Sequence, residues 1–249
     1  MPRLLLSDEL WLKLKLILLQ CGVYDKSNLR LVVEGILYRL RTGLPWRDLP
    51  DYFGFWNSVY KKFNSWSARG IWKKVFNLLV IEPDLEWGFI DGSYVKAHQH
   101  STGAASDDDQ AIGTSRAGNT STIHMVVDSF GLPIHFEITG GQVHDSSAAD
   151  DLLAKSPVFD FTIADKGYDK ENLRTQISDR GSIPMIPRRC NSKVGNADMD
   201  WHLYKHRHLV ENQFARMKQY RAIATRYDKL KRNFESMVAI ACAIQWLPM

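Results

Sequence analysis

Three carboxylates in the sequence have neighbours that suit a metal-binding role. Asp91, in "FIDGSY", follows an apolar run that predicts a β-strand, and Gly92 after it lets the backbone turn near a ligand. Asp165, in "FTIADKGYD", follows a second apolar run, and Glu211 lies in the helical stretch "YKHRHLVENQFARMK". An aspartate at the end of a buried strand is costly unless it is paired or metal-bound. Carboxylates that clamp two divalent ions are a common device for phosphoryl transfer, although each aspartate alone could be a turn former or a helix cap.

The stretch around Glu211 carries cations at helical spacing. At about 100° per residue, a stripe roughly 60° wide contains Tyr204, Arg207, Glu211 and Lys218. This face could bind a metal ion and a phosphate. The alternative is a helix edged by an Arg207–Glu211 ion pair, which is worth only a few tenths of a kcal/mol and does not account for Tyr204 or Lys218.

Charge is unevenly distributed along the 249 residues. Residues 1–80 have a net charge of +7, residues 81–185 of −10 and residues 186–232 of +8. Basic arms suit a polyanion such as nucleic acid, and an acidic centre either stays solvated or collects cations. The composition is that of a globular protein, and the longest apolar stretches are about half the length that a membrane span needs. We therefore expect a soluble intracellular protein whose three cysteines are reduced.

The first eighty residues have helical periodicity. Apolar spacing predicts helices in "LRLVVEGILYRLRTG", which ends at Gly43, in "FWNSVYKKFNSWSARG" and in "IWKKVFNLLV". Lys61 and Lys62 lie on the polar side of the second helix. Short helices with a basic face indicate a helix-turn-helix-like DNA-binding unit. A small helical bundle with a solvated lysine face accounts for the pattern equally well.

From residue 86 the pattern changes to short strands. Strands are predicted in "WGFIDGSYVKA", "STIHMVVD", "LPIHFEITG", "VFDFTIADKG" and "SIPMI", and helices in "SSAADDLLA" and "KENLRTQISDR". The segment "STGAASDDDQ" is expected to be a loop. Three strands joined by hairpin links and followed by alternating helix and strand indicate a mixed α/β sheet.

The pattern Tyr-x2-Arg-x3-Glu-x6-Lys resembles the signature of the DDE transposases of bacterial insertion sequences, in particular the insertion sequence 5 family within the insertion sequence 4 group. The resemblance covers nearly the whole chain. It includes "LRTGLPWRDLPDYFGFWNSVYKKFNSWSARGIW" near the N-terminus and "IDGSYVKAHQ", "QAIGTSRAG", "IHMVVDSFGLPIHF", "TGGQVHD" and "ADKGYD" further on. The chain departs from the family at Thr122, where lysine is frequent, and at Ala117, where the family has a glycine pair.

The resemblance implies a ribonuclease H-like catalytic domain over about 85–249, preceded by a small all-α DNA-binding domain over 1–80. Carried over by position, Asp91, Asp165 and Glu211 match the catalytic, metal-binding triad, with Asp91 on the first strand, Asp165 just after the fourth and Glu211 on a following helix. The implied cofactor is Mg²⁺, for which Mn²⁺ can substitute. The implied reaction cleaves phosphodiester bonds at the terminal inverted repeats of a transposon and joins the released 3′-hydroxyl to target DNA.

The residues predicted to contact DNA are basic or adjoin the triad. They are Tyr204, Arg207, Lys218, Arg116, Arg188, Arg189, Lys61 and Lys62. Arg116 lies in a Gly/Ser loop, where a solvated arginine is an equally good interpretation. Gln142, His144 and Asp145 of "TGGQVHD" also resemble a family motif, but a loop anchored by hydrogen bonds accounts for them, so they are assigned no catalytic role.

Double-stranded DNA is the implied partner, both as transposon ends and as target. A homodimer is expected in the active complex because two ends must be brought together, and the expected location is the bacterial cytoplasm, at the nucleoid. Two alternatives stay open. A related nuclease would stop after hydrolysis, and an inactive or domesticated DNA-binding descendant would need only the basic arms. No phosphate-binding glycine-rich loop occurs in the sequence, so ATP is not expected.

Overall fold

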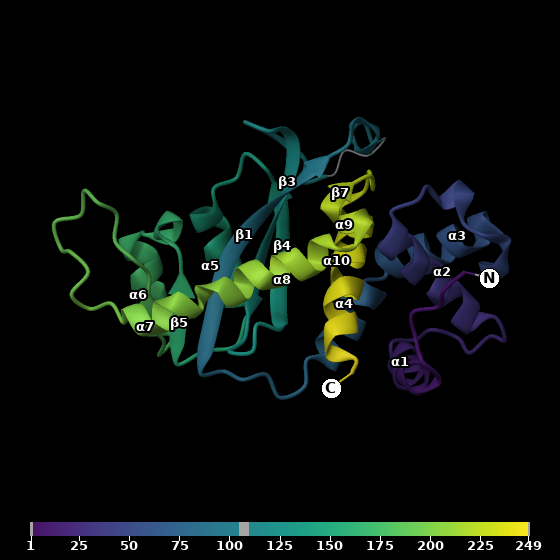
Figure 1. Cartoon of the computed structure of the whole chain (residues 1–249), viewed down its shortest axis with the longest axis horizontal. Coiled ribbons are helices and arrows are strands. Elements are labelled where there is room, and N and C mark those ends of the chain that lie inside the picture. Colours follow the sequence, from purple (N-terminus) through teal and green to yellow (C-terminus); the bar gives the residue numbers. More distant parts are fainter. Residues whose placement is uncertain (1, 105–109, 249) are drawn as a thin grey trace. The chain divides into compact units, whose positions relative to one another are not determined.

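The computed structural model describes residues 2–104 and 110–248 of the chain (Figure 1). Contacts between residues divide it into two compact units. Unit 1 comprises Met1–Ile81, Ala97–Gln110 and Met217–Met249, and unit 2 comprises Glu82–Lys96 and Ala111–Arg216. Five residues of the predicted loop "STGAASDDDQ", 105–109, lie outside the described residues. No helix in the described ranges is long and apolar enough to span a membrane.

Unit 1 is built almost entirely of helices, as the periodicity of the first eighty residues predicted. Its helices are α1 (Asp8–Gln20), α2 (Leu29–Thr42), α3 (Trp56–Ala68), α4 (Ile71–Leu79), α9 (Arg221–Ala224) and α10 (Lys231–Trp246). It also contains the 3₁₀ turns η1 (Trp46–Asp48), η2 (Asp51–Phe53) and η3 (Gln99–Ser101) and the short strand β7 (Thr225–Arg226). Gly43 ends α2 in the left-handed conformation, with φ of 68°, which a residue without a Cβ adopts at no steric cost.

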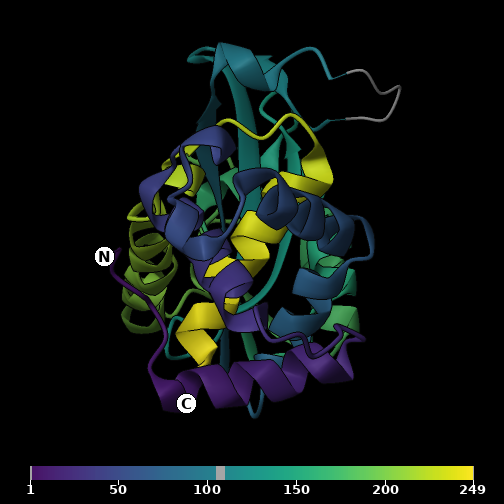
Figure 2. The same ribbon diagram turned by 90° about the vertical axis from the view of Figure 1, so that its right-hand side faces the viewer.

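The C-terminal helix belongs to the helical unit. Helix α10 packs against α2, α3 and α4 (Figure 2) and buries most of its length, including Phe234, Met237 and Cys242. Contacts therefore group residues 217–249 with the N-terminal helices, which differs from the predicted catalytic domain over 85–249. The physical reason is that α10 is apolar on several sides and needs apolar partners around it. The functional division into residues 1–80 and 85–249 remains a prediction.

Unit 2 contains a mixed sheet with helices on both faces. Its strands are β1 (Trp87–Ala97), β2 (Gly113–Ser115), β3 (Gly118–Val127), β4 (Pro133–Gly140), β5 (Phe161–Ala164) and β6 (Ile183–Met185). Their order is β2-β3-β1-β5-β6, with β4 on β3. The pairs β1–β3, β2–β3 and β3–β4 are antiparallel, and β1–β5 and β5–β6 are parallel. The mixed α/β sheet predicted from the strand pattern is confirmed.

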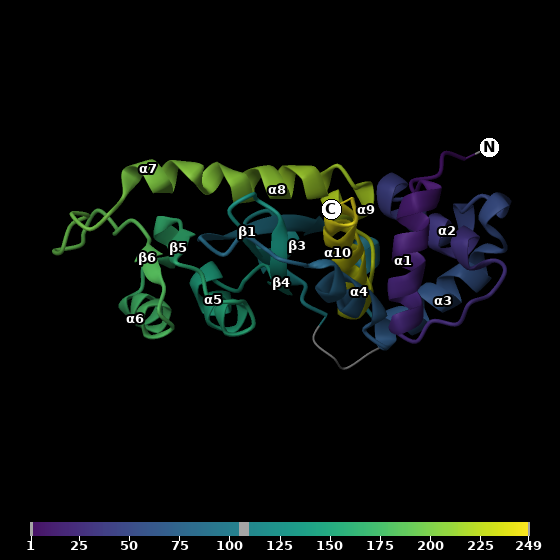
Figure 3. The same ribbon diagram turned by 90° about the horizontal axis from the view of Figure 1, so that it is seen from below.

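The helices of unit 2 lie in two layers. They are α5 (Asp145–Ala154), α6 (Glu171–Asp179), α7 (Trp201–Tyr204) and α8 (His208–Lys218), with the 3₁₀ turns η4 (Lys166–Tyr168) and η5 (Lys205–Arg207). Helices α5 and α6 pack on one face of the sheet, and α8 crosses the other (Figure 3). The core under α5 and α6 includes Ile90, Val126 and Tyr168. This order, with an antiparallel meander followed by alternating helices and parallel strands, is a ribonuclease H-like fold.

Two local expectations were wrong. The backbone does not turn at Gly92, because β1 continues to Ala97 and stays paired with β3 as far as Lys96 opposite Thr120. The stretch from Tyr204 to Lys218 is not one continuous α-helix either. The 3₁₀ turn η5 separates α7 from α8, and its three residues per turn wind more tightly than the 100° stripe assumed.

Candidate catalytic site

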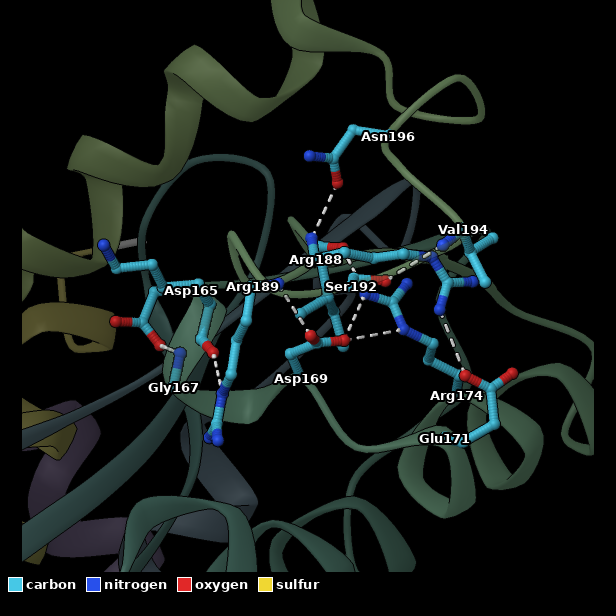
Figure 4. Close-up of polar contacts among 12 residues, drawn as sticks. Asp165, Gly167, Asp169, Glu171, Arg174, Arg188, Arg189, Ser192, Val194 and Asn196 are labelled. Carbon is cyan, nitrogen blue, oxygen red and sulfur yellow. Dashed lines mark hydrogen bonds and ion pairs between the residues drawn. The ribbon is translucent and has the colours of Figure 1, made fainter.

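Asp91 and Asp165 occupy adjacent positions on two neighbouring strands. Strands β1 and β5 run parallel with Ile90 opposite Ala164, and the two aspartates are the residues that directly follow this pair. Asp165 ends the paired segment and caps η4, where its Oδ1 accepts a hydrogen bond of 2.8 Å from the backbone N–H of Gly167 (Figure 4). Parallel pairing therefore brings Asp91, within β1, beside Asp165, at the point where β5 ends.

Arg207 joins Asp91 to Glu211. Its Nη1 donates to Asp91 Oδ2 at 2.9 Å, and its Nη2 donates to Glu211 Oε1. Glu211 lies in the first turn of α8, four residues after Arg207. The Arg207–Glu211 ion pair considered from the sequence thus forms, and the same guanidinium also binds a second carboxylate from the sheet. One cationic group stands between two members of the predicted triad.

The site is partly withdrawn from solvent. The side chains of Asp91 and Arg207 are 18% and 19% exposed, whereas that of Glu211 is 54% exposed. Burial raises the pKa of Asp91, although Arg207 opposes the shift. Burial works against the charge of Arg207, but Asp91 and Glu211 outweigh it and raise the pKa of the guanidinium. The guanidinium and the carboxylates therefore stabilise each other's charges. Removing either the cation or a carboxylate would leave its partner charged and poorly solvated.

Tyr204 belongs to the same group of side chains. It is hydrogen-bonded to Arg207 and lies near enough to Asp91 and Asp165 for both to influence it. Burial, followed by the two aspartates, raises the pKa of its phenol. The hydroxyl therefore stays protonated at neutral pH and can donate a hydrogen bond to a phosphate oxygen.

The donor set suits a hard divalent ion. Asp91, Asp165 and Glu211 offer carboxylate oxygens, the ligands that Mg²⁺ prefers in proteins. Within residues 2–104 and 110–248, no group of three or more His, Cys, Asp or Glu side chains is already arranged to hold a metal ion. Glu211 contacts the guanidinium from an exposed position, and its side chain can change rotamer without disturbing a core. The guanidinium of Arg207 already lies between Asp91 and Glu211. The space between these two carboxylates is therefore one that favours a cation.

A second set of polar contacts fixes the loop that carries Asp165. Asp169 accepts hydrogen bonds from Arg174 Nη2 at 2.9 Å and from the backbone N–H of Arg189 at 2.8 Å (Figure 4). Arg174 also donates to the carbonyl of Ile186 at 2.5 Å. Burial opposes ionisation of Asp169, but these donors outweigh it and lower its pKa. The contacts connect η4, α6 and the segment after β6, and so they brace the turn that presents Asp165.

The arginines predicted to contact DNA differ in their solvent exposure and in their partners. Arg188 forms an ion pair with Glu171, in which Nη1 and Oε2 are 3.1 Å apart. The side chain of Arg188 is only 13% exposed. Arg189 is exposed, and its side chain runs beside Asp165, with Nε 3.5 Å from the carbonyl of Lys166 (Figure 4). Arg116 is exposed in the turn between β2 and β3. Of these three, Arg189 is the one that the structure brings next to a triad residue.

The predicted lysines lie on unit 1. Lys61 is exposed on α3, and Lys62 donates to Asn28 Oδ1 at 3.3 Å. Burial, followed by repulsion from Lys26, lowers the pKa of Lys62. Lys218 is the last residue of α8 and is grouped with unit 1; burial lowers its pKa.

Three residues that the sequence did not assign to the site lie beside it. Asp145 begins α5, His124 lies in β3 opposite Gly92, and Tyr168 ends η4. Asp91 and Asp165 both influence the pKa of Asp145 and of Tyr168, so the four side chains lie in one electrostatic environment. The signal in the sequence is the Gly92 that follows Asp91, because a residue without a side chain in a continuous strand indicates close approach of another group.

Family models match almost the whole chain. Residues 83–246 match the model described as "Transposase DDE domain", and residues 6–76 match the one described as "Putative transposase of IS4/5 family". The chain belongs to the DDE transposase family. This confirms the resemblance drawn from the Tyr204–Lys218 pattern. The protein is a transposase by its family membership.

Two proteins of similar sequence are also described as transposases of insertion sequence elements. A "Putative transposase for insertion sequence element IS6501" of Brucella ovis is 36% identical over 132 residues, which are 51% of this chain and 98% of the relative. A "Putative transposase for insertion sequence element IS402" of Burkholderia cepacia is 27% identical over 142 residues, which are 53% of this chain and 64% of the relative. The chain thus spans somewhat less than two thirds of the second transposase.

Solved structures with a similar course of the chain include other transposases. The piggyBac transposase in a synaptic complex with hairpin DNA matches with a TM-score of 0.41 and 13% identity, over 76% of this chain and 50% of that one. A pre-cleavage Mos1 transpososome matches with a TM-score of 0.29 and 8% identity, over 91% of this chain and 80% of that one. The chain spans about half of the piggyBac protein.

Proposed function

We propose that this transposase cleaves DNA at the ends of its transposon and joins the ends to target DNA, using Asp91, Asp165 and Glu211 with Mg²⁺. The observation that carries the proposal is the group of carboxylates around Arg207, drawn from the sheet and from α8. Asp165 enters the group because it follows the strand that pairs with β1. A structural ion pair of α8 alone would not need the two aspartates on the strands.

The side chains have separate tasks in this proposal. Asp91, Asp165 and Glu211 hold the divalent ions, which when bound would supply an activated oxygen nucleophile and neutralise charge on the leaving oxygen. Arg207 and Tyr204 lie beside Asp91 and orient and neutralise the scissile phosphate. The guanidinium has to release Glu211 and turn toward the phosphate as the carboxylates take up their ligands. Because the charged groups are partly buried, their interactions with the phosphate are stronger than at a fully hydrated surface.

The reaction consists of two displacements at phosphorus. In the first, a water oxygen bonds to the phosphorus at the transposon end, and the 3′-oxygen leaves and gains a proton. In the second, this 3′-hydroxyl attacks a target phosphodiester and displaces a 3′-oxygen there. The DNA partners are the terminal inverted repeats and the target, and Arg189, Arg188, Arg116, Lys218, Lys61 and Lys62 provide salt-sensitive phosphate contacts. We expect two copies of the chain to act together in the bacterial cytoplasm, one on each end.

The test is cleavage and strand transfer on labelled duplexes that carry the inverted repeats flanking the gene. Purified wild-type protein is expected to nick these ends and to join a pre-cleaved end to target DNA in Mg²⁺ or Mn²⁺. Asp91→Asn should remove both activities and leave end binding largely intact, because it removes charge and changes little volume. Asp179→Asn, an exposed carboxylate at the end of α6, is the matched control.

Other outcomes distinguish the alternatives. Cleavage without joining of a pre-cleaved end would indicate a nuclease. Binding without cleavage in either metal would indicate an inactive or domesticated DNA-binding protein. Cleavage that survives in Asp91→Asn would show that the triad assignment is wrong.

A further inference from the structure

His124, Asp145 and Tyr168 each carry a buried polar atom that lacks a hydrogen-bond partner in the described part of the chain. His124 is fully buried, and its Nδ1 lies 3.5 Å from Asp145 Oδ1. Tyr168 is 1% exposed, and Asp145 is the charged group that most affects its hydroxyl. None of the atoms His124 Nδ1, Asp145 Oδ1 and Tyr168 Oη has a hydrogen-bond partner in the described part of the chain. Buried polar atoms without partners are rare, and each one calls for an explanation.

Only one ring nitrogen of His124 has a hydrogen-bond partner in the described part of the chain. Its Nε2 lies 2.8 Å from Thr139 Oγ1, and the same hydroxyl lies 3.3 Å from the carbonyl oxygen of Gly140. Nδ1 instead faces Asp145 Oδ1 at 3.5 Å, which is longer than an ordinary hydrogen bond. Nδ1 is therefore the side of the ring that lacks a partner.

Glycine at position 92 lets this carboxylate approach the triad strand. A Cβ built on Gly92 would lie 2.6 Å from Asp145 Oδ1, closer than real Cβ atoms come, and 3.2 Å from His124 Nδ1, which is a tight contact. Gly92 directly follows Asp91, and β1 runs straight through it. Glycine at this position therefore leaves room for the Asp145 carboxylate against β1, one residue after Asp91.

The charges around Asp145 are mostly negative. Burial raises the pKa of Asp145, and repulsion from Asp91 and Asp165 raises it further; His144 opposes them. A helix N-terminus favours a carboxylate, which explains why an acidic residue can begin α5. It does not explain why Asp145 Oδ1 faces a buried nitrogen at 3.5 Å and has no hydrogen-bond partner in the described part of the chain.

We infer that Asp145 is a fourth carboxylate of the catalytic centre and helps to hold a divalent ion together with Asp91 and Asp165. A water molecule of that ion then hydrogen-bonds to His124 Nδ1 and gives this nitrogen a partner. This inference rests on the proposed function, since it assumes that the triad binds metal. The alternative is that Asp145 only stabilises the first turn of α5.

The test is binding of Mn²⁺ to the full-length protein, measured by titration calorimetry without DNA. Asp145→Asn is expected to weaken the affinity about tenfold, the size of effect typical when a group that supports a metal site is lost. Asp150→Asn and Asp151→Asn remove exposed carboxylates from the same helix and should bind as the wild type does. Melting temperatures in EDTA report any loss of folding.

A second measurement does not depend on a variant. Fe²⁺ with peroxide and ascorbate cuts the backbone close to the bound ion, and wild-type cuts are expected near Asp145 as well as near Asp91 and Asp165. If Asp145→Asn binds Mn²⁺ normally and no cut occurs near Asp145, while Asp91→Asn abolishes binding, the fourth carboxylate is refuted and the triad stands. If the wild type does not bind Mn²⁺, or Asp91→Asn has no effect, the proposed metal site itself fails.

Discussion

Arg207 is the residue on which the charge balance of the site depends. It contacts one carboxylate of β1 and one of α8, and all three side chains lie at the edge of the protein interior. A guanidinium has planar geometry and always carries its charge, so it can bind two carboxylates at once where an ammonium would bind one. We interpret it as an internal cation that holds Asp91 and Glu211 close together, and that opposes the rise in the pKa of Asp91 caused by burial, until metal ions and a phosphate enter.

This interpretation predicts the behaviour of Arg207→Gln. In EDTA the variant should melt at a lower temperature than the wild type, because Asp91 and Glu211 would face each other without a cation. Added Mg²⁺ should raise its melting temperature more than that of the wild type, because the competing guanidinium is gone. Arg216→Gln changes an exposed arginine of the same helix and is the control. Equal Mg²⁺ shifts in Arg207→Gln and wild type would mean that Arg207 does not compete with the metal.

The sequence allowed the triad residues to be named, but the way they interact could not be read from it. Helical spacing placed Arg207 beside Glu211, and this contact forms. The second contact, to Asp91, joins residues that lie 116 positions apart. Asp145 was passed over for the same reason, because its neighbours His124 and Gly92 come from other strands. Only the packing of α5 on the sheet brings them together.

At the scale of elements, the turn after β5 depends on one carboxylate. Asp169 is bonded by Arg174 of α6 and by the backbone of Arg189, and the two ionic side chains are 12% and 6% exposed. Removing the charge from such a pair leaves a buried guanidinium with a weaker partner. The same turn holds Asp165, which caps η4. Asp169 is therefore a positioning residue for the site.

We expect Asp169→Asn to lower the free energy of unfolding by about 1–3 kcal/mol, the usual cost of an unsatisfied buried group. Urea denaturation at neutral pH measures it, and Asp179→Asn at the exposed end of α6 should change little. The folded pKa of Asp169 lies below its ordinary value of about 3.9, so the stability it contributes is present above that pH and is lost as the pH falls further. The difference between variant and wild type should therefore shrink below about pH 4. A difference that stays constant there would contradict this role.

The element pattern was largely predictable, and the exceptions are local. Alternating apolar residues predicted β3 and β4, and turn residues around "SFG" predicted the link between them. The 3₁₀ turn at Lys205–Arg207 was missed, because α and 3₁₀ winding differ by less than one residue per turn and leave the same apolar spacing over so short a stretch. The strand predicted over "WGFIDGSYVKA" forms over its full length as β1, although a turn was also expected at Gly92 because glycine usually marks one. Here pairing with β3 overrides that preference.

At the scale of the whole molecule, residues from both ends of the chain form unit 1. Arg39 of α2 and Asp228 are joined by two hydrogen bonds of 3.1 and 3.0 Å, and their side chains are 5% and 6% exposed. Helix α10 follows directly and packs against α2, α3 and α4. Sequence analysis assigned this segment to the predicted catalytic domain, because an apolar helix fits a sheet as well as a bundle. Its contacts group it with the helices of unit 1, and the ion pair is one of them.

Breaking this ion pair should loosen both ends of the chain together. Asp228→Ala leaves Arg39 buried without a carboxylate, and we expect a loss of about 3–5 kcal/mol in the free energy of unfolding. The control is Asp8→Ala, which breaks the exposed Asp8–Arg30 pair of the same unit and should cost less than about 1 kcal/mol. Hydrogen exchange should then rise in α2 and α10 alike. Faster exchange in α10 alone would mean that the N-terminal helices hold together without the C-terminal segment, and unit 1 would not be one cooperative body.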